Sequence, residues 1–228
     1  MEARIVRHAD LRPCYNAFVD TRTPGSEAKE NFTIIGPGVS ENPEQHVHIA
    51  EPHGFNIGGA RQPPGCVNSQ HSHETAEVFV VHSGRLVLLE SGRLIDTTKG
   101  ETVPVGERPM PPTTGGQAAA MRRVSPAEAS SRVVRDERRP GLTPIIGDAA
   151  PLGGEHGFSM DRLDLDGGAT IQSRTAQVLF VHRGALRLSW AHGETDLSAG
   201  DTVTFPSGLE RSLVAQQATT TFLVRREA

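Results

Sequence analysis

Short apolar runs separated by glycine and proline dominate the chain from about its middle third onward. The clearest are EVFVVHSG, RLVLLESG, QVLFVHRG, ALRLSWAHG, GDTVTFPSG and TTFLVRR. These runs are rich in β-branched and aromatic residues, and tight-turn residues bound them. Short strands at this spacing are typical of a β-sandwich or β-barrel. The pattern therefore predicts an all-β protein.

The two halves of the chain repeat each other at a spacing of one hundred positions. TAEVFVVHSGRL, which starts at Thr75, matches TAQVLFVHRGAL, which starts at Thr175, and GETV at Gly100 matches GDTV at Gly200. Further upstream, EPHGF meets GEHGF once a loop difference of three residues is allowed. Self-similarity over this distance predicts two related β domains.

Four segments follow from this repeat. We expect an N-terminal extended arm at 1–50, an N-terminal barrel at 51–124, a linker with a short helix at 125–153 and a C-terminal barrel at 154–228. Ser125 as N-cap, Pro126 at the first helical position and Glu128 predict the start of that helix, and Pro140 predicts its end. Extended arms of this kind often pack on a neighbouring subunit.

Composition excludes some classes of function. The 228 residues suffice for one large core or two small ones, and a net charge of −4 gives no general attraction to nucleic acid or to anionic membranes. No apolar run approaches the roughly 20 residues that span a bilayer, and the N-terminus is charged, so we expect a cytoplasmic protein. Cys14 and Cys66 lack zinc-site spacing, and we expect both to be free and structural.

The candidate chemistry lies in GCVNSQHSHETAEVFVVHSG. Side chains alternate along a strand, so His71 and His73 point the same way and Glu77 joins them. Phe79 and Val81 share this parity and are expected to line the same interior. His82 has the opposite parity, which indicates a structural role. Two imidazoles and a carboxylate suit Fe(II), Mn(II), Ni(II), Zn(II) or Cu(II), and the set matches the facial triad of non-haem iron oxygenases.

The second copy of this stretch lacks these ligands. At the corresponding positions it carries Ile171, Ser173 and Gln177. None of these side chains supplies an imidazole or a carboxylate, so the second barrel is not expected to hold a divalent cation.

The spacing Gly65-x5-His71-x-His73-x3-Glu77-x6-Gly84 resembles the first conserved motif of the cupin superfamily. A duplicated cupin barrel is called a bicupin. The resemblance implies an all-β, double-stranded β-helix or jelly roll, duplicated as a bicupin, with a short connecting helix. The second cupin motif normally adds a histidine, but this sequence has Arg211 at that place in the second half and Pro111 in the first.

The resemblance also implies a function. It suggests a metal-dependent enzyme acting on a small organic molecule, as a non-haem oxygenase of the quercetinase-like or ring-cleaving kind. The metal ligands would be His71, His73 and Glu77, with Glu77 also the catalytic proton acceptor and Fe(II) the favoured ion over Mn, Ni, Zn or Cu. A homodimer is a family expectation, and no nucleic-acid or membrane partner is expected.

Several alternatives stay open on the sequence alone. The chain could be a non-catalytic small-molecule-binding or structural bicupin, or a metal-dependent isomerase or decarboxylase. His46 and His48 form a second HxH pair that could complete a coordination sphere. Arg211 and Gln177 could form a polar pocket for an anionic ligand, although a surface or structural role is the commoner use of such residues.

Overall fold

The computed structural model describes residues 2–17, 25–36, 42–43, 45–66, 68, 77–90, 93–98, 102–105, 137–148, 150–153 and 156–227. At positions 77, 85, 87–90, 93–98 and 102–105 it describes the backbone alone. Within this part of the chain the regular structure is β-strand, apart from one 3₁₀ turn, η1 (His8–Asp10). The prediction of an all-β protein is confirmed. The predicted helix falls mainly on 125–136, outside the described residues.

The chain divides into two compact units, which we describe separately. One unit joins residues 1–68 with 138–228, and the other contains residues 69–137. No helix in the described ranges combines the length and the apolar character needed to cross a membrane.

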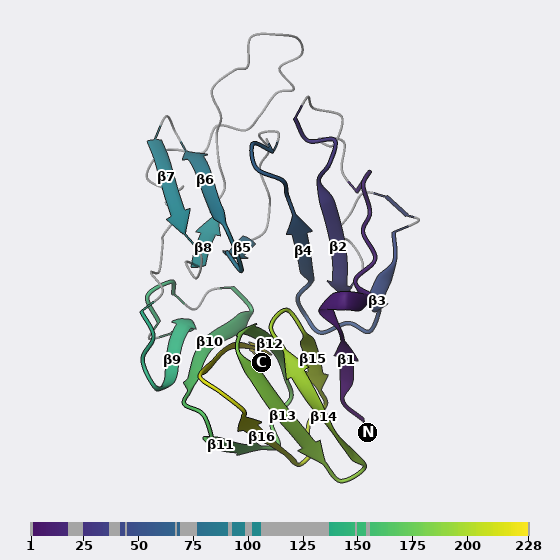
Figure 1. Cartoon of the computed structure of the whole chain (residues 1–228), viewed down its shortest axis with the longest axis vertical. Coiled ribbons are helices and arrows are strands. Elements are labelled where there is room, and N and C mark those ends of the chain that lie inside the picture. Colours follow the sequence, from purple (N-terminus) through teal and green to yellow (C-terminus); the bar gives the residue numbers. More distant parts are fainter. Residues whose placement is uncertain are drawn as a thin grey trace. The chain divides into compact units, whose positions relative to one another are not determined.

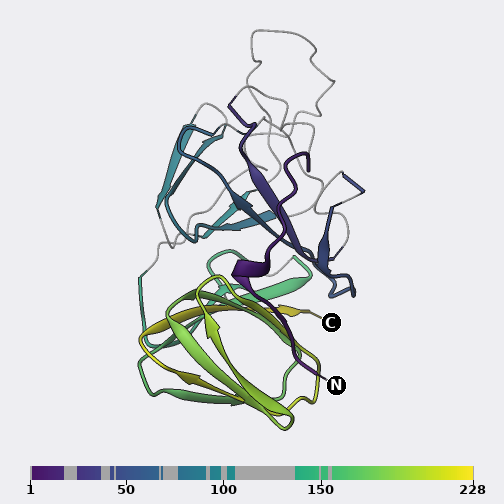
Figure 2. The same ribbon diagram turned by 45° about the vertical axis from the view of Figure 1, so that its right-hand side comes forward.

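The C-terminal barrel consists of two facing antiparallel sheets (Figures 1 and 2). The larger sheet has the order β1-β15-β12-β17-β10-β9 and the smaller has the order β11-β16-β13-β14. Their bounds are β1 Arg4–Val6, β9 Gly141–Ile146, β10 Phe158–Leu165, β11 Thr170–Ser173, β12 Gln177–Arg183, β13 Ala185–Trp190, β14 Gly193–Ser198, β15 Thr202–Phe205, β16 Arg211–Ala215 and β17 Thr219–Arg226.

The core of this barrel lies between the two sheets. The larger sheet contributes Leu179 and Val181, and the smaller contributes Leu186, Leu188 and Leu213, all with 1% exposure or less. These residues follow the period-2 alternation of their strands, because each strand turns one face inward. Burial of this apolar face is the main source of the barrel's stability.

The first 68 residues pack on the C-terminal barrel of the same chain. β1 extends the larger sheet by pairing with β15, while β2 (Glu30–Ile35), β3 (Val47–Ile49) and β4 (Ile57–Arg61) form a sheet of their own in the order β3-β2-β4. Ile35 and Ile49 join Val178, which points to the side of β12 opposite Leu179, in a second apolar cluster. The predicted arm therefore contains strands, and it covers the outer face of the larger sheet.

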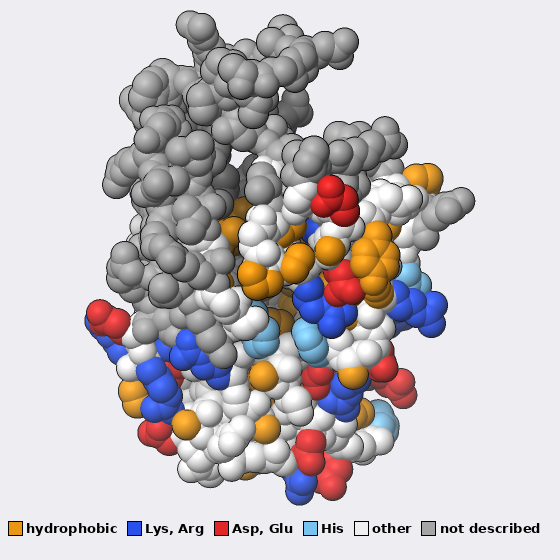
Figure 3. Space-filling model, turned by 45° about the horizontal axis from the view of Figure 1, so that its top comes forward, with side chains coloured by type: hydrophobic (Ala, Val, Ile, Leu, Met, Phe, Trp, Pro, Cys, Tyr) orange, Lys and Arg blue, Asp and Glu red, His pale blue; other side chains and the backbone are white. Residues whose placement is uncertain are grey.

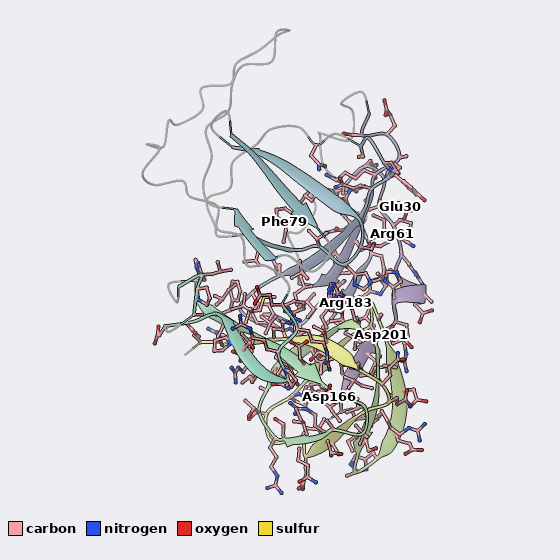
Figure 4. All side chains as sticks on the ribbon, turned by 60° about the vertical axis from the view of Figure 1, so that its left-hand side comes forward. Glu30, Arg61, Phe79, Asp166, Arg183 and Asp201 are labelled. Atoms are coloured by element: carbon pink, nitrogen blue, oxygen red, sulfur yellow. The ribbon has the colours of Figure 1, made fainter. Side chains whose placement is uncertain are left out.

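Several ion pairs on this unit join residues on different strands. Glu30 and Arg61 lie side by side on the neighbouring strands β2 and β4, with Nε and Oε2 2.8 Å apart (Figure 4). Acidic and basic side chains mix over the described surface in Figure 3 and do not gather into a patch of one sign.

The second unit contains two strand pairs. β5 (Glu77–Val80) pairs with β8 (Thr102–Val105), and β6 (Arg85–Glu90) pairs with β7 (Arg93–Thr98), both antiparallel. These pairs show that strand structure continues after Gly84, over the stretch that matches β13 to β15 at a spacing of one hundred. The proline-rich stretch 106–116 lies outside the described residues.

Candidate functional site

The metal motif falls only partly on the described residues. His71 and His73 lie outside them, and Glu77 is described by its backbone, at the first position of β5 opposite Val105. Phe79, labelled in Figure 4, is half-buried and shares the strand parity of Glu77. Val81 is buried, at 8% exposure. The assignment of His71, His73 and Glu77 as metal ligands therefore stays a prediction.

The strand register around Glu77 repeats in the C-terminal barrel. Glu77 pairs with Val105, and Gln177, one hundred positions later, pairs with Phe205. The three following pairs correspond in the same way, and so does every pair from Arg85↔Thr98 to Glu90↔Arg93 when compared with β13 and β14. A shift of one residue in either pair would turn its side chains to the other face. The two stretches thus share the same strand register.

A glycine with positive φ begins the second hairpin of each stretch. Gly84 has φ of 80° and Gly184 has φ of 84°. A Cβ at Gly184 would lie 2.6 Å from the Ala218 carbonyl oxygen, so only glycine fits there. The same turn chemistry therefore follows the motif strand in both stretches.

The C-terminal barrel shows where the motif positions point. Ser173 on β11 pairs with Arg211 on β16, and Ile171 packs against the barrel core. Gln177 shares the parity of the core residues Leu179 and Val181 on β12. The three positions that correspond to His71, His73 and Glu77 therefore lie on the interior face of this barrel.

Arg211 stands in this interior, in the place where the second cupin motif has a histidine. It is 2% exposed, so a surface role is wrong. Its Cζ lies 3.9 Å from the centroid of the Phe205 ring, which is a cation–π contact. Nη2 donates to the Ser173 hydroxyl at 3.3 Å and to the Thr175 carbonyl at 2.9 Å, and Nη1 donates to the Leu209 carbonyl at 3.3 Å. Burial lowers the pKa of Arg211 to about 10.

The positions of the C-terminal barrel that correspond to cupin metal ligands carry other residue types. Isoleucine, serine, glutamine and arginine occupy the four ligand positions, and none of them is an imidazole or a carboxylate. Across the described ranges no group of three His, Cys, Asp or Glu side chains is arranged to hold a metal ion.

The second HxH pair lies at the start of β3, with His46 just before the strand and His48 within it. The rings of His46 and His48 meet edge to face with centroids 4.5 Å apart, and the Arg12 amide donates to His48 Nε2 at 3.4 Å. Burial lowers the pKa of His48, and the nearby charges of His46 and Arg12 lower it further. No third ligand joins this pair among the described residues.

His182 has a packing role. It is 1% exposed on β12, and its ring meets the Phe222 ring edge-on with centroids 5.5 Å apart. Phe222 lies outside the barrel core cluster. The histidine therefore packs away from the interior positions, as predicted for the residue at this place in the repeat.

Three buried carboxylates, Asp161, Asp164 and Asp201, were not singled out from the sequence. Asp201 accepts hydrogen bonds from the backbone amides of His8 and Ser198, and pairs with Arg7 at 2.9 Å. Figure 4 labels Asp201 in the C-terminal barrel. It ties η1 to the turn between β14 and β15. The only signal in the sequence is the turn sequence SAGD, which is typical of loops and not specific.

Asp164 is the second of these carboxylates. Its Oδ2 lies 2.9 Å from Arg162 Nε, and its Oδ1 accepts from the Thr220 hydroxyl at 2.6 Å. Both members of the ion pair are buried. A neutralised, hydrogen-bonded pair of this kind serves the fold and offers no net charge to a ligand. Cys14 and Cys66 are free and half-buried, as expected.

Solved structures share this architecture over the whole chain. YhhW from Escherichia coli matches 99% of this chain and 98% of its own, with 12% identity and a TM-score of 0.62. The chain has the cupin jelly-roll fold. A structure of bacterial pirin YhhW in complex with nickel(II), also from Escherichia coli, matches 100% of both chains with 11% identity and a TM-score of 0.54.

A cupin-2 domain protein from Shewanella frigidimarina NCIMB 400 matches a smaller part. The match covers 40% of this chain and 85% of that one, with 14% identity and a TM-score of 0.33. No family model matches the sequence. No curated protein matches it either.

Proposed function

We propose that the chain is a metal-dependent cupin enzyme acting on a small organic molecule, with one mononuclear site in its N-terminal barrel. His71, His73 and Glu77 hold the ion in this proposal. The observation that carries it is the shared register: Glu77 pairs with Val105 as Gln177 pairs with Phe205. We propose that Glu77 faces the interior of its barrel, as Gln177 does in the C-terminal barrel, and that His71 and His73 share this face by strand parity.

The chemistry of these residues fits a divalent cation. Two imidazoles and a carboxylate suit Fe(II), which we favour, as well as Mn, Ni, Zn or Cu. Two histidines and a glutamate on an interior face without a cation would leave buried polar groups unpaired, at several kcal/mol. The nickel(II) ion of bacterial pirin YhhW, a protein of the same fold, supports the proposal.

The bound ion would supply Lewis acidity toward a substrate oxygen or O₂, at positions that three protein ligands leave open. Glu77 is both ligand and proton acceptor, since a carboxylate can change its mode of binding while it takes up a proton. Phe79 and Val81, on the same face, provide an apolar wall that holds an organic substrate and excludes water. We assign the reaction to the non-haem oxygenases of the quercetinase-like or ring-cleaving kind.

The matching registers also support a duplicated barrel, that is, a bicupin. We propose that the C-terminal barrel serves structure and assembly and that the protein forms homodimers. In this proposal 51–124 and 154–228 are the repeated barrel segments, and β1 and β9 extend the larger sheet of the C-terminal barrel beyond the second segment.

A non-catalytic bicupin is the second candidate. The observation that favours it is Arg211, which stands where the fourth metal ligand is expected and is held by neutral acceptors. A metal-dependent isomerase or decarboxylase would use the same three ligands.

The test is elemental analysis of the purified full chain after incubation with Fe(II), Mn(II), Ni(II) and Zn(II) in turn. We expect about one ion per chain in wild type and less than about a tenth in the His71→Ala, His73→Ala variant. The matched control is His46→Ala, His48→Ala, which removes an HxH pair of the same spacing and is expected to keep the ion. A wild type with less than about a tenth of an ion per chain contradicts the enzyme proposal.

A further inference from the structure

Arg211 is a buried cation that points into the C-terminal barrel. It opens β16, whose alternate residues Leu213 and Ala215 belong to the barrel core. The guanidinium lies at the same depth as the Phe205 ring on which it stacks. The side chain is one of the largest fully buried groups in the described part of the chain. Its charge is therefore removed from water.

Arg211 has more N–H donors than the structure gives it acceptors. Three bonds, to Leu209, Ser173 and Thr175, engage three of the five N–H groups that a guanidinium carries. Two N–H groups remain, and the buried Nε is without an acceptor. The three acceptors are two carbonyls and a hydroxyl, all of them neutral.

No described carboxylate neutralises this charge. Burial is the cause of the lowered pKa of Arg211, without an opposing contribution from an acidic neighbour. At neutral pH the group is still charged, because a pKa of about 10 lies well above 7. The other fully buried arginine, Arg162, shows the usual solution, a paired aspartate. An uncompensated buried charge is costly, and an anion that joins it would relieve that cost.

Ser173 provides a second donor beside this charge. Its Oγ accepts from Arg211 Nη2 and from the Thr175 amide, each at 3.3 Å, so its hydroxyl proton is left to donate. Ser173 is half-buried and Thr175 is exposed, so the donors lie just under the surface at this end of the barrel. A carboxylate oxygen could accept from Nε–H and from the hydroxyl together.

Arg174 and Glu210 are the sequence neighbours of Ser173 and Arg211. Arg174 pairs with Glu210 at 2.8 Å, with 69% and 72% of the two side chains exposed. An ion pair this exposed contributes little to stability, so breaking it costs little.

We propose that Arg211 and Ser173 form a binding site for a small carboxylate in the C-terminal barrel. The site takes formate, acetate or the carboxylate end of a small organic acid. It lies where the metal ion of a cupin barrel would be bound. The Arg211 guanidinium supplies the positive charge that the metal ion would otherwise supply. It is independent of the metal site proposed for the N-terminal barrel.

Saturation-transfer NMR of the metal-free full chain with formate and acetate tests the site. We expect saturable binding with a dissociation constant on the order of millimolar. Arg211→Met is expected to weaken it by about tenfold or more, since it removes the charge. Arg187→Met is the matched control, because Arg187 is an exposed arginine that pairs with Asp196, and it is expected to bind as wild type does.

Ser173→Ala keeps the guanidinium, so it tests the carboxylate site even if the Arg211→Met variant fails to fold. It is expected to weaken binding by about threefold to tenfold through loss of the hydroxyl donor. The His71→Ala, His73→Ala variant is expected to bind carboxylate unchanged, which separates this site from the metal site. Three results would overturn the proposal: no saturable binding to wild type, undiminished binding in both Arg211→Met and Ser173→Ala, or chloride binding as tight as that of acetate.

Discussion

Arg211 and Ser173 face each other across β16 and β11, and the guanidinium donates to the serine hydroxyl inside the C-terminal barrel. In a metal-binding cupin these two positions would each carry a histidine. Under the proposed duplication, the C-terminal barrel keeps the frame of the metal site and fills it with different chemistry. The contrast with the N-terminal motif leads to a gain-of-function prediction.

Ligands placed at the equivalent positions should create a second metal site. The variant Ile171→His, Ser173→His, Gln177→Glu, Arg211→His is expected to bind about two ions per chain, against about one in wild type. The variant Ile171→His, Ser173→His, Gln177→Glu, which retains Arg211, should bind no additional ion. The guanidinium repels a cation at this place. Elemental analysis, with circular dichroism to verify folding, measures the difference. Equal metal content in the two variants would show that these positions do not surround a common centre.

Asp201 should stabilise the fold more than an exposed ion pair does. Its side chain is 6% exposed and accepts from two backbone amides and from Arg7. Asp201→Asn is expected to lower the free energy of unfolding by about 1 to 3 kcal/mol, because charged hydrogen bonds are lost. Glu51→Gln, which breaks the exposed pair with Arg4, should change it by less than about 1 kcal/mol. Urea unfolding compares the two, and equal losses would contradict the role given to Asp201.

Gly200 should tolerate alanine less well than Gly208 does. Both have positive φ, 95° and 81°, so each alanine variant is strained by about 1 kcal/mol. A Cβ at Gly200 would also lie 2.6 Å from the His8 ring, whereas at Gly208 it meets nothing within 4 Å. Gly200→Ala should therefore lose more stability in urea unfolding, and His8→Ala should recover part of the difference. A double-mutant cycle without coupling would refute the contact.

His48 should titrate below the ordinary histidine pKa of 6.5, chiefly because it is partly buried. A lowered pKa means that the unfolded chain binds the proton more tightly, so stability is present above pH 6.5 and declines as the pH falls below it. His46→Ala should raise the pKa of His48 only part of the way, since it removes the neighbouring charge and leaves the burial. NMR titration of the imidazole signals measures both values. A pKa at or above 6.5 in wild type would contradict the packing of β3.

The sequence predicted the all-β class and the strand frame well, because period-2 runs such as QVLFVHRG report burial on one face. The strand parity predicted for Glu77, Phe79 and Val81 also applies to Gln177, Leu179 and Val181, one hundred positions later, and the last two lie in the barrel core. The sequence alone could not predict that residues 1–68 cover the larger sheet, because the cluster of Ile35, Ile49 and Val178 joins segments that are distant in the chain. The burial of Arg211 could not be predicted from the sequence for the same reason, because an arginine is expected at the surface unless its partners across the barrel are known.

The most direct test of the central claim, that two imidazoles and Glu77 hold one ion, is pulsed electron paramagnetic resonance of the protein loaded with Cu(II). Modulation from ¹⁴N should report two coordinated imidazoles in wild type and in His46→Ala, His48→Ala. The His71→Ala, His73→Ala variant should lose both. Retention of the imidazole signals in that variant, or their loss with His46 and His48, would contradict the assignment of the metal site.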